Sequence, residues 1–179
     1  MFRSSWFYLL VLGLGLLTLG LVVRSGMLAV KNPGEPINAA MRAAMAAEQP
    51  ELTTEQSLYI DHVYPTAHVL TSGLRYLVLN PGHGDRIPRI SDEVAVRYTG
   101  RLLGGAEFDS SDKHGGILTF HAGLGDVIKG WDEAILQMKK GEKRRLIVPW
   151  WLAYGDAGKP PVIPPRSVLV FDVELVDFR

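Results

Sequence analysis

The stretch Val127-Ile128-Lys129-Gly130-Trp131 decides how the rest of the chain is arranged. In it, two branched apolar residues and a glycine precede an indole, and apolar residues continue after it at helical spacing. This combination predicts a helix whose first turn presents an aromatic surface, with strands before and after it in the chain supplying the walls. The aromatic surface has two interpretations at this point: the packed core of a small domain, or the floor of a binding pocket.

The helix itself is predicted over residues 127–138. Trp131, Ile135 and Met138 lie at positions i, i+4 and i+7, which places them on one helical face. Gly141 is expected to end the helix, because glycine readily adopts the left-handed conformation that often follows a last turn. Lys139 and Lys140 would then complement the helix dipole.

Short strands are predicted on both sides of this helix. In residues 93–102 the apolar Val94, Val96 and Tyr98 alternate with more polar neighbours, which is the period-2 pattern of a half-buried strand. The segment NPGHG at residues 80–84 predicts a turn after a strand over residues 73–79. Further strands are expected over residues 107–110, 117–122, 143–149 and 168–178. The pattern predicts an α+β domain over residues 72–179, an antiparallel sheet folded over one helix.

The composition excludes several classes of chemistry. Lys+Arg and Asp+Glu number 19 each in 179 residues, so no net field attracts the chain to nucleic acid. There is no cysteine, which excludes disulfides, thiolate metal sites and cysteine nucleophiles. The five histidines show no metal-ligand spacing, so solvated histidines are favoured over a metal site. The acidic residues of the domain form no obvious acid/base pair, and they include Asp109, Asp112, Asp126, Asp132 and Glu133.

An uncharged apolar run, WFYLLVLGLGLLTLGLVV, occupies residues 6–23, with Arg3 before it and Arg24 after it. A membrane span needs about 20 such residues, whereas the apolar part of a signal peptide has about 7–15. We therefore expect residues 1–25 to be a retained single-pass membrane anchor, in preference to a buried core helix. The flanking charges nearly balance and leave its orientation open.

Residues 26–71 are expected to be a linker with short helices. Turn chemistry at residues 31–36 is followed by a helix-forming, Ala-rich segment over residues 39–48. A second short helix is expected over residues 55–63, with Leu58 and Val63 on roughly one side. Neither piece is large enough to bury a core alone, so a spacer is favoured over an arm for self-association.

The aromatic residues of the domain are the remaining candidates for a site. Tyr98, Phe108, Trp131, Tyr154 and Phe171 each have core packing as their simplest explanation. Trp131 at a helix start and Tyr154 in a Gly-rich loop are harder to assign wholly to the core, because their polar atoms need partners. The domain has no nucleophile elbow, phosphate-binding loop or serine triad.

Six ordered motifs resemble those of the FKBP-type peptidyl-prolyl cis-trans isomerases. They are VRYTGRL at residues 96–102, FDSS at 108–111, VIKGWDE at 127–133, LAYGD at 152–156, IPP at 163–165 and LVFDVEL at 169–175. The resemblance extends from about residue 73 to the end of the chain. It implies a five- or six-stranded antiparallel sheet wrapped around the 127–138 helix, with the active pocket between them.

Carried over residue by residue, the resemblance assigns ten positions to the pocket. Trp131 resembles its floor, the backbone N–H of Ile128 is the donor to a substrate carbonyl, and Asp109 lies beside the twisting amide. The implied catalytic residues are Asp109, Tyr98, Phe108 and Tyr154, and the implied substrate-binding residues are Leu118, Val127, Ile128, Trp131, Ile163 and Phe171.

Three positions depart from the family pattern. Leu118 stands where an aromatic residue is common, so one wall of the pocket is expected to be less rigid. His114 occupies a place where some members have an arginine that pairs with the aspartate, and Lys159 replaces a residue that is often neutral or histidine. These changes bear on affinity, and on macrolide binding in particular, more than on the reaction.

The chemistry fits an apolar pocket without reactive groups. Rotation about a peptide bond has a barrier of about 18–20 kcal/mol, and at X–Pro bonds it takes roughly 10–100 s uncatalysed. The planar amide is more dipolar than the twisted one, so a dry pocket disfavours the ground state more than the twisted state. No metal or cofactor is required.

Two functions follow from the resemblance. The first is an active prolyl isomerase whose clients are proline-containing polypeptides, with macrolide inhibitors of the family as further ligands. The alternative is an FKBP-like binding module or holdase chaperone without significant turnover. For the anchored chain, family habit in bacteria favours a domain on the periplasmic or extracytoplasmic side.

Overall fold

The computed structural model describes residues 50–105 and 107–179, and these form a compact unit that begins at Pro50. The expected membrane anchor and the expected helix over residues 39–48 lie outside the described residues. Among the residues that the structure describes, no helix has both the length and the apolar character to span a membrane.

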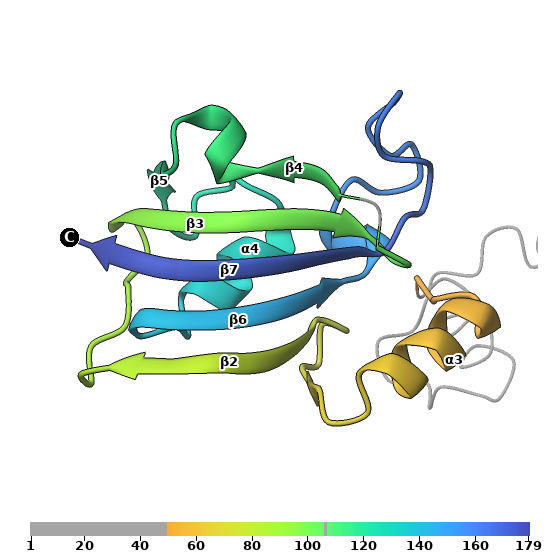
Figure 1. Cartoon of the computed structure of the whole chain (residues 1–179), viewed down its shortest axis with the longest axis horizontal. Coiled ribbons are helices and arrows are strands. Elements are labelled where there is room, and N and C mark those ends of the chain that lie inside the picture. The colour runs from red at the N-terminus through yellow and green to blue at the C-terminus, as the bar shows by residue number, and fades with distance from the viewer. Residues whose placement is uncertain (1–49, 106) are drawn as a thin grey trace, which may run out of the picture. The chain divides into compact units, whose positions relative to one another are not determined.

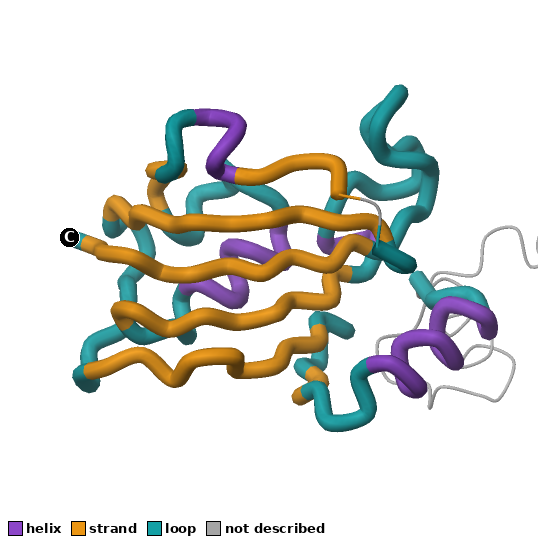
Figure 2. Tube along the Cα trace, in the orientation of Figure 1, coloured by secondary structure: helices purple, strands orange, loops and turns teal. Residues whose placement is uncertain are grey.

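At the centre of this unit, the described residues form one antiparallel sheet of seven strands. They are β1 (His68–Val69), β2 (Arg75–His83), β3 (Glu93–Leu102), β4 (Glu107–Ser110), β5 (Leu118–His121), β6 (Lys140–Val148) and β7 (Leu169–Phe178). The order is β1-β2-β6-β7-β3-β4, and β5 also pairs with β3. Helix α4 (Lys129–Ile135) lies against one face of the sheet (Figures 1 and 2). This arrangement agrees with the predicted antiparallel sheet over one short helix, with the two-residue β1 as an addition.

The core between α4 and the sheet explains why the alternating patterns form strands. Val94 and Val96 on β3 are completely buried, as are Leu146 and Val148 on β6, and they face the helix side. A residue at position 130 with a side chain would collide with the core, because an added Cβ would lie 2.6 Å from Cγ1 of Val148. The glycine of the opening motif therefore lets the helix approach β6 closely.

Helix α4 is shorter than predicted. It begins after Ile128, whose backbone is extended, and its last turn ends at Leu136. Met138 is buried as expected but follows the helix. Gly141 has a positive φ of 74°, but it lies in β6 and does not cap α4. Its missing side chain leaves room for the ring of His83, since an added Cβ would lie 2.5 Å from that ring.

The turn predicted at residues 80–84 is wrong, because β2 continues through it. Asn80 pairs with Lys143 and Pro81 with Glu142, after a register shift between Val78 and Asn80. A proline is tolerated there because β1 pairs with β2 only near Arg75, so the outer edge of β2 needs no N–H donor at position 81.

Helix α3 (Thr54–Val63) belongs to the compact unit, although the sequence placed it in a linker that ended at residue 71. Thr53 and Gln56 form a reciprocal capping box at its start. The side chain that it buries is Ile60, which packs in a second apolar cluster with Ile147 and Val168. Leu58 and Val63, which the sequence placed on roughly one side of this helix, are 65% and 41% exposed.

Two adjacent tryptophans fasten this N-terminal segment to the domain. They belong to the 3-10 turn η2 (Trp150–Leu152), and their rings pack edge to face at 5.4 Å. The indole N–H of Trp151 donates to the carbonyl of Ser72 at 2.9 Å, and that of Trp150 donates to the carbonyl of Glu51 at 3.2 Å. The segment of residues 51–72 is thus held to the domain at both of its ends.

Candidate active site

An open pocket with a cavity volume of about 160 Å³ lies where α4 meets β3, β4, β5 and β7. Nine of the ten residues assigned from the sequence line it, namely Tyr98, Phe108, Asp109, Leu118, Val127, Ile128, Trp131, Tyr154 and Phe171. Asp126 is the tenth lining residue and was missed. Ile163 does not reach the wall, because it is buried in the core with 2% of its surface exposed.

Aromatic rings build the floor of this pocket. Trp131 is 4% exposed and packs edge to face with Tyr98 at 5.0 Å and with Phe171 at 5.2 Å. Phe108 packs in the same manner on Phe171 at 5.6 Å. Gly100 on β3 makes this packing possible, since an added Cβ would lie 2.7 Å from the Phe171 ring and 2.9 Å from that of Phe108. The rings hold one another in edge-to-face geometry, which fixes the shape of the pocket.

The indole nitrogen of Trp131 is a polar atom that the fold does not use. Among residues 50–105 and 107–179, Nε1 of Trp131 is buried and has no hydrogen-bond partner. An unpaired buried donor of this kind typically costs about 1–3 kcal/mol of folding stability. The indole therefore occupies this position at the expense of stability.

Asp109 is held as an ionised carboxylate at the edge of the aromatic floor. Its Oδ2 accepts a hydrogen bond from the Tyr98 hydroxyl at 2.8 Å, and its Oδ1 accepts one from the backbone N–H of Ser110 at 2.9 Å. Nε2 of His114 lies 2.8 Å from the same Oδ1. Partial burial opposes ionisation, but the bonds from Tyr98, His114 and Ser110 outweigh it and hold the pKa of Asp109 below its usual range.

Tyr98 is correspondingly fixed as a donor. Burial, and then its hydrogen bond to Asp109, raise the pKa of the Tyr98 phenol well above its usual value. The backbone N–H of Tyr98 also bonds to the Ser111 hydroxyl, in the 3-10 turn η1 (Ser111–His114), at 3.2 Å. The phenol is thereby committed to Asp109, and the two side chains form a rigid polar corner of the pocket.

The first turn of α4 offers a backbone donor to the pocket. Ile128 precedes the helix and accepts from Trp131 N at 2.9 Å, while its own N–H has no partner among the described residues. Asp132 secures the approach to this turn, because its carboxylate accepts from the N–H groups of Gly123 and Gly125, each at 2.9 Å. From the sequence, Asp132 was only one of several acidic residues without an acid/base pair, because its hydrogen-bond donors are backbone N–H groups.

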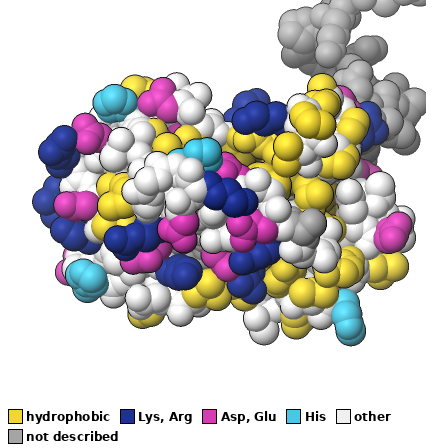
Figure 3. All heavy atoms as spheres, turned by 45° about the horizontal axis from the view of Figure 1, so that its top comes forward, with side chains coloured by type: hydrophobic (Ala, Val, Ile, Leu, Met, Phe, Trp, Pro, Cys, Tyr) yellow, Lys and Arg dark blue, Asp and Glu magenta, His cyan; other side chains and the backbone are white. Residues whose placement is uncertain are grey.

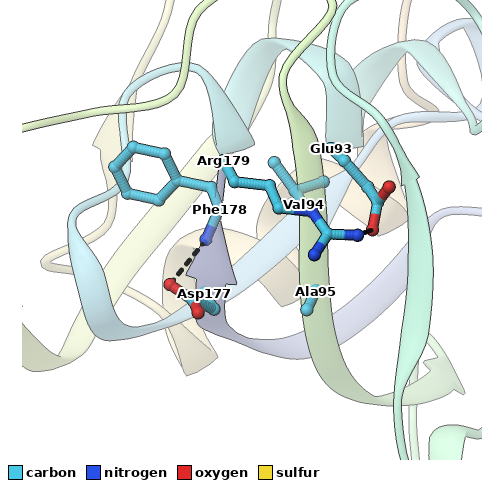
Figure 4. Close-up of a pocket in the computed structure, with 6 residues that line it drawn as sticks. All are labelled: Glu93, Val94, Ala95, Asp177, Phe178 and Arg179. Atoms are coloured by element: carbon cyan, nitrogen blue, oxygen red, sulfur yellow. Dashed lines mark hydrogen bonds and ion pairs between the residues drawn. The ribbon is translucent and has the colours of Figure 1, made fainter.

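A second pocket, of about 130 Å³, lies where β3 begins and β7 ends. Figure 4 shows its lining, in which Arg179 reaches Glu93 at 2.9 Å and the N–H of Phe178 bonds to Asp177 at 2.9 Å. The register of β3 and β7 shifts between Ala95 and Val96, and the hollow lies beside this shift. The register shift explains this second pocket, which shares no lining residue with the aromatic pocket.

The fold and the aromatic pocket together define a class of protein. The pocket is sized for a small apolar ring, and its lining includes two carboxylates and a backbone N–H that has no partner among the described residues. The helix under it carries the motif from which the fold was predicted. These are the features expected of a peptide-binding prolyl isomerase.

Comparison with known proteins identifies the family. Residues 84–176, more than half of the chain, match the family of FKBP-type peptidyl-prolyl cis-trans isomerases. The chain is 46% identical over 104 residues to FK506-binding protein 1A of Emericella nidulans, covering 58% of this chain and 96% of that protein. It is 55% identical over 89 residues to peptidyl-prolyl cis-trans isomerase FPR2 of Saccharomyces cerevisiae, covering 49% and 66%.

A solved structure gives the same result. The crystal structure of AtFKBP13 matches with a TM-score of 0.60 and 40% sequence identity, over 63% of this chain and 98% of that one. The chain therefore belongs to the FKBP-type peptidyl-prolyl cis-trans isomerases, and the predicted family and enzymatic function are confirmed.

Proposed function

We propose that isomerisation of X–Pro bonds takes place in the aromatic pocket by non-covalent binding alone. The observation that carries this is the joined set of edge-to-face rings and the Tyr98–Asp109 corner. The proline ring packs on Trp131, and the N–H of Ile128 donates to a substrate carbonyl. Phe108 and Phe171 exclude water from the amide, which disfavours its planar, more dipolar form.

The polar corner acts on the twisting bond. As the amide leaves planarity, its nitrogen lone pair localises and its carbonyl carbon becomes more positive. A fixed carboxylate at Asp109 stabilises that polarisation without moving, because Tyr98 and Ser110 already hold it. The Tyr154 hydroxyl, on the same wall, is the second group that bonds the bound peptide chain.

The test is NMR exchange spectroscopy on a short X–Pro peptide with the full chain in a non-ionic detergent. We expect acceleration over buffer, and a loss of at least tenfold in kcat/KM for Asp109→Ala and for Phe108→Ala with an unchanged circular dichroism spectrum. Asp156→Ala, in an exposed ion pair with Arg166, is the matched control. Full activity in both pocket variants would place the reaction elsewhere.

The pocket is also proposed to bind FK506-type macrolides. Support comes from the name of the Emericella nidulans relative and from the aromatic pocket of this chain. Leu118 lines this pocket in place of an aromatic residue, so we expect weaker binding than an aromatic wall would give. Titration of FK506 against the intrinsic tryptophan fluorescence of the chain, with Phe108→Ala as the negative control, measures it.

We further propose that residues 6–23 anchor the enzyme in a membrane as a single pass, with residues 26–179 on the extracytoplasmic side. Support comes from the uncharged apolar length and its flanking arginines. Sodium carbonate extraction should leave the full chain in the membrane fraction and release a chain that starts at residue 50. Protease added outside intact spheroplasts should degrade the domain. Its protection until lysis would reverse the proposed orientation.

A further inference from the structure

Two histidine–aspartate pairs contribute their carboxylates to the lining of the aromatic pocket. On one side Nε2 of His114 lies 2.8 Å from Oδ1 of Asp109. On the other, Nδ1 of His121 lies 3.3 Å from Oδ2 of Asp126, and the backbone N–H of His121 donates to the same oxygen at 3.0 Å. Both histidine side chains are more than half exposed to solvent.

Asp109 and Asp126 are the acidic residues among those that line the pocket, and the lining contains no lysine or arginine. Asp126 also lines an adjoining groove of about 390 Å³ along β5, which shares Leu118 and Val127 with the pocket. A polypeptide that places its proline in the pocket therefore passes these two carboxylates with its neighbouring residues.

Most of the other charged groups near each histidine–aspartate pair form ion pairs of their own. Beside His114, Glu107 on β4 pairs with Lys113 at 3.1 Å, Asp112 belongs to the same turn, and the Tyr98 phenol faces Asp109 from β3. Beside His121, its partner on β3 is Glu93, which pairs with Arg179 at 2.9 Å. Lys159 lies 5.5 Å from the centre of the Tyr154 ring.

The charge at the pocket edge thus depends on the two histidines. Histidine side chains ordinarily change charge near pH 6.5. When both are neutral, the two carboxylates present two negative charges to the substrate, and when both are protonated the pairs are neutral overall. We propose that these pairs set the substrate specificity of the isomerase: it prefers a cationic residue next to proline at neutral pH and loses this preference in mild acid.

This inference rests on the proposed function of the pocket. Its size follows from electrostatics: at about 7 Å and the dielectric constant of water, one carboxylate changes the affinity for a unit charge by about threefold. It attracts lysine and repels glutamate to the same extent. One carboxylate at that distance therefore makes a Lys-Pro peptide exceed a Glu-Pro peptide in kcat/KM by about tenfold at pH 8, and the second carboxylate adds to this ratio.

The experiment compares three peptides, Ala-Xaa-Pro-Phe with blocked ends and Xaa as Lys, Ala or Glu. NMR exchange spectroscopy on the full chain in non-ionic detergent avoids a coupling protease, which has its own pH dependence. We expect a Lys/Glu ratio of kcat/KM of at least about ten at pH 8 and within about twofold of unity at pH 5.5.

Variants assign the effect to the two pairs. His114→Gln/His121→Gln keeps the carboxylates without a titratable partner, so its Lys/Glu ratio should stay high at both pH values. His62→Gln, on the exposed surface of α3, is the matched control and should behave as the unaltered chain does.

Three outcomes overturn the inference. A ratio near unity at pH 8, with normal turnover of the Ala peptide, refutes the specificity while leaving the isomerase function intact. A double variant whose ratio falls in acid as in the unaltered chain refutes the role of the histidines. Failure to turn over any of the three peptides refutes the proposed function of the pocket, and the inference with it.

Discussion

Gly130→Ala is the substitution that tests most directly how the helix is seated on the sheet. The added Cβ would lie 2.6 Å from Cγ1 of Val148, whereas carbon atoms in contact are about 3.5–4.0 Å apart. The helix or the strand must therefore yield by about 1 Å. Overpacking of a core costs about 1–3 kcal/mol, and replacing glycine by alanine in a helix returns at most about 1 kcal/mol. We expect a net loss of about 1–2 kcal/mol in the free energy of unfolding.

A double-mutant cycle identifies the contact responsible. Val148→Ala alone removes two buried methyl groups and should lower the free energy of unfolding by about 2 kcal/mol. It also removes the atom that collides with the new Cβ. On that background Gly130→Ala should be neutral or stabilising, so the two changes should couple by at least about 1 kcal/mol.

The assay is urea unfolding of residues 50–179 followed by circular dichroism, with equal m-values as the test that only stability has changed. Additivity of the two substitutions within about 0.5 kcal/mol would refute the explanation, since distant and independent sites behave in that way. A Gly130→Ala variant as stable as the unaltered domain would show that the helix is free to shift on the sheet.

Three further predictions concern the sheet, the N-terminal helix and the pocket wall. Arg145 holds Asp172 by two hydrogen bonds of 2.6 and 2.8 Å; burial opposes ionisation, but these bonds keep the pKa of Asp172 below its usual range. Asp172→Asn should therefore lower the free energy of unfolding by about 1–2 kcal/mol at pH 7. In urea unfolding at a series of pH values, this difference from the unaltered domain should shrink below pH 4, as the pH falls through the depressed pKa. A difference that is the same at all pH values would contradict this prediction. Ile60→Ala should lower the free energy of unfolding of residues 50–179 by about 2–4 kcal/mol and the exposed Leu58→Ala by less than about 0.5 kcal/mol, and equal effects would mean that α3 does not pack as described. Leu118→Phe should tighten FK506 binding about threefold to tenfold by calorimetry through added aromatic contact, and weaker binding would indicate that the pocket has no room for the ring.

Much of the fold was predictable because its elements obey local rules. The strand over residues 93–102 has the same bounds as β3, since its alternation is uninterrupted and both of its faces have a defined environment. The helix was predicted at the correct place, but the predicted range of residues 127–138 is longer than α4. Its apolar spacing continues to Met138, and that side chain enters the core from a turn that periodicity does not distinguish from a helix.

Other features depend on partners that are distant in the sequence. Pro81 is normally a turn residue, and it is tolerated in β2 because the outer edge of that strand is unpaired there. The burial of Ile60 depends on Ile147 and Val168, about a hundred residues further along the chain. Neither relation has a local signature, so the turn was misplaced and the packing of α3 on the domain was not predicted.

For the site, nine of the ten residues that the motif resemblance assigned line one pocket, and the tenth, Ile163, is buried in the core. The resemblance marks positions and not the direction of a side chain. Asp126 was missed because it lies just before the motif at residues 127–133 and outside it. In the structure it lines the pocket, and its carboxylate contacts His121 at the end of β5.

The shifted register and proline of β2 have a consequence for how this protein coexists with its clients. An isomerase of folding chains is surrounded by extended polypeptides that seek a strand to pair with, and an exposed sheet edge is the surface that they would join. Between Val78 and Asn80 the pairing register of β2 shifts, and the strand lacks an N–H donor at Pro81. The edge strand is thereby made a poor template for aggregation, and unfolded chains are left to bind through their prolines.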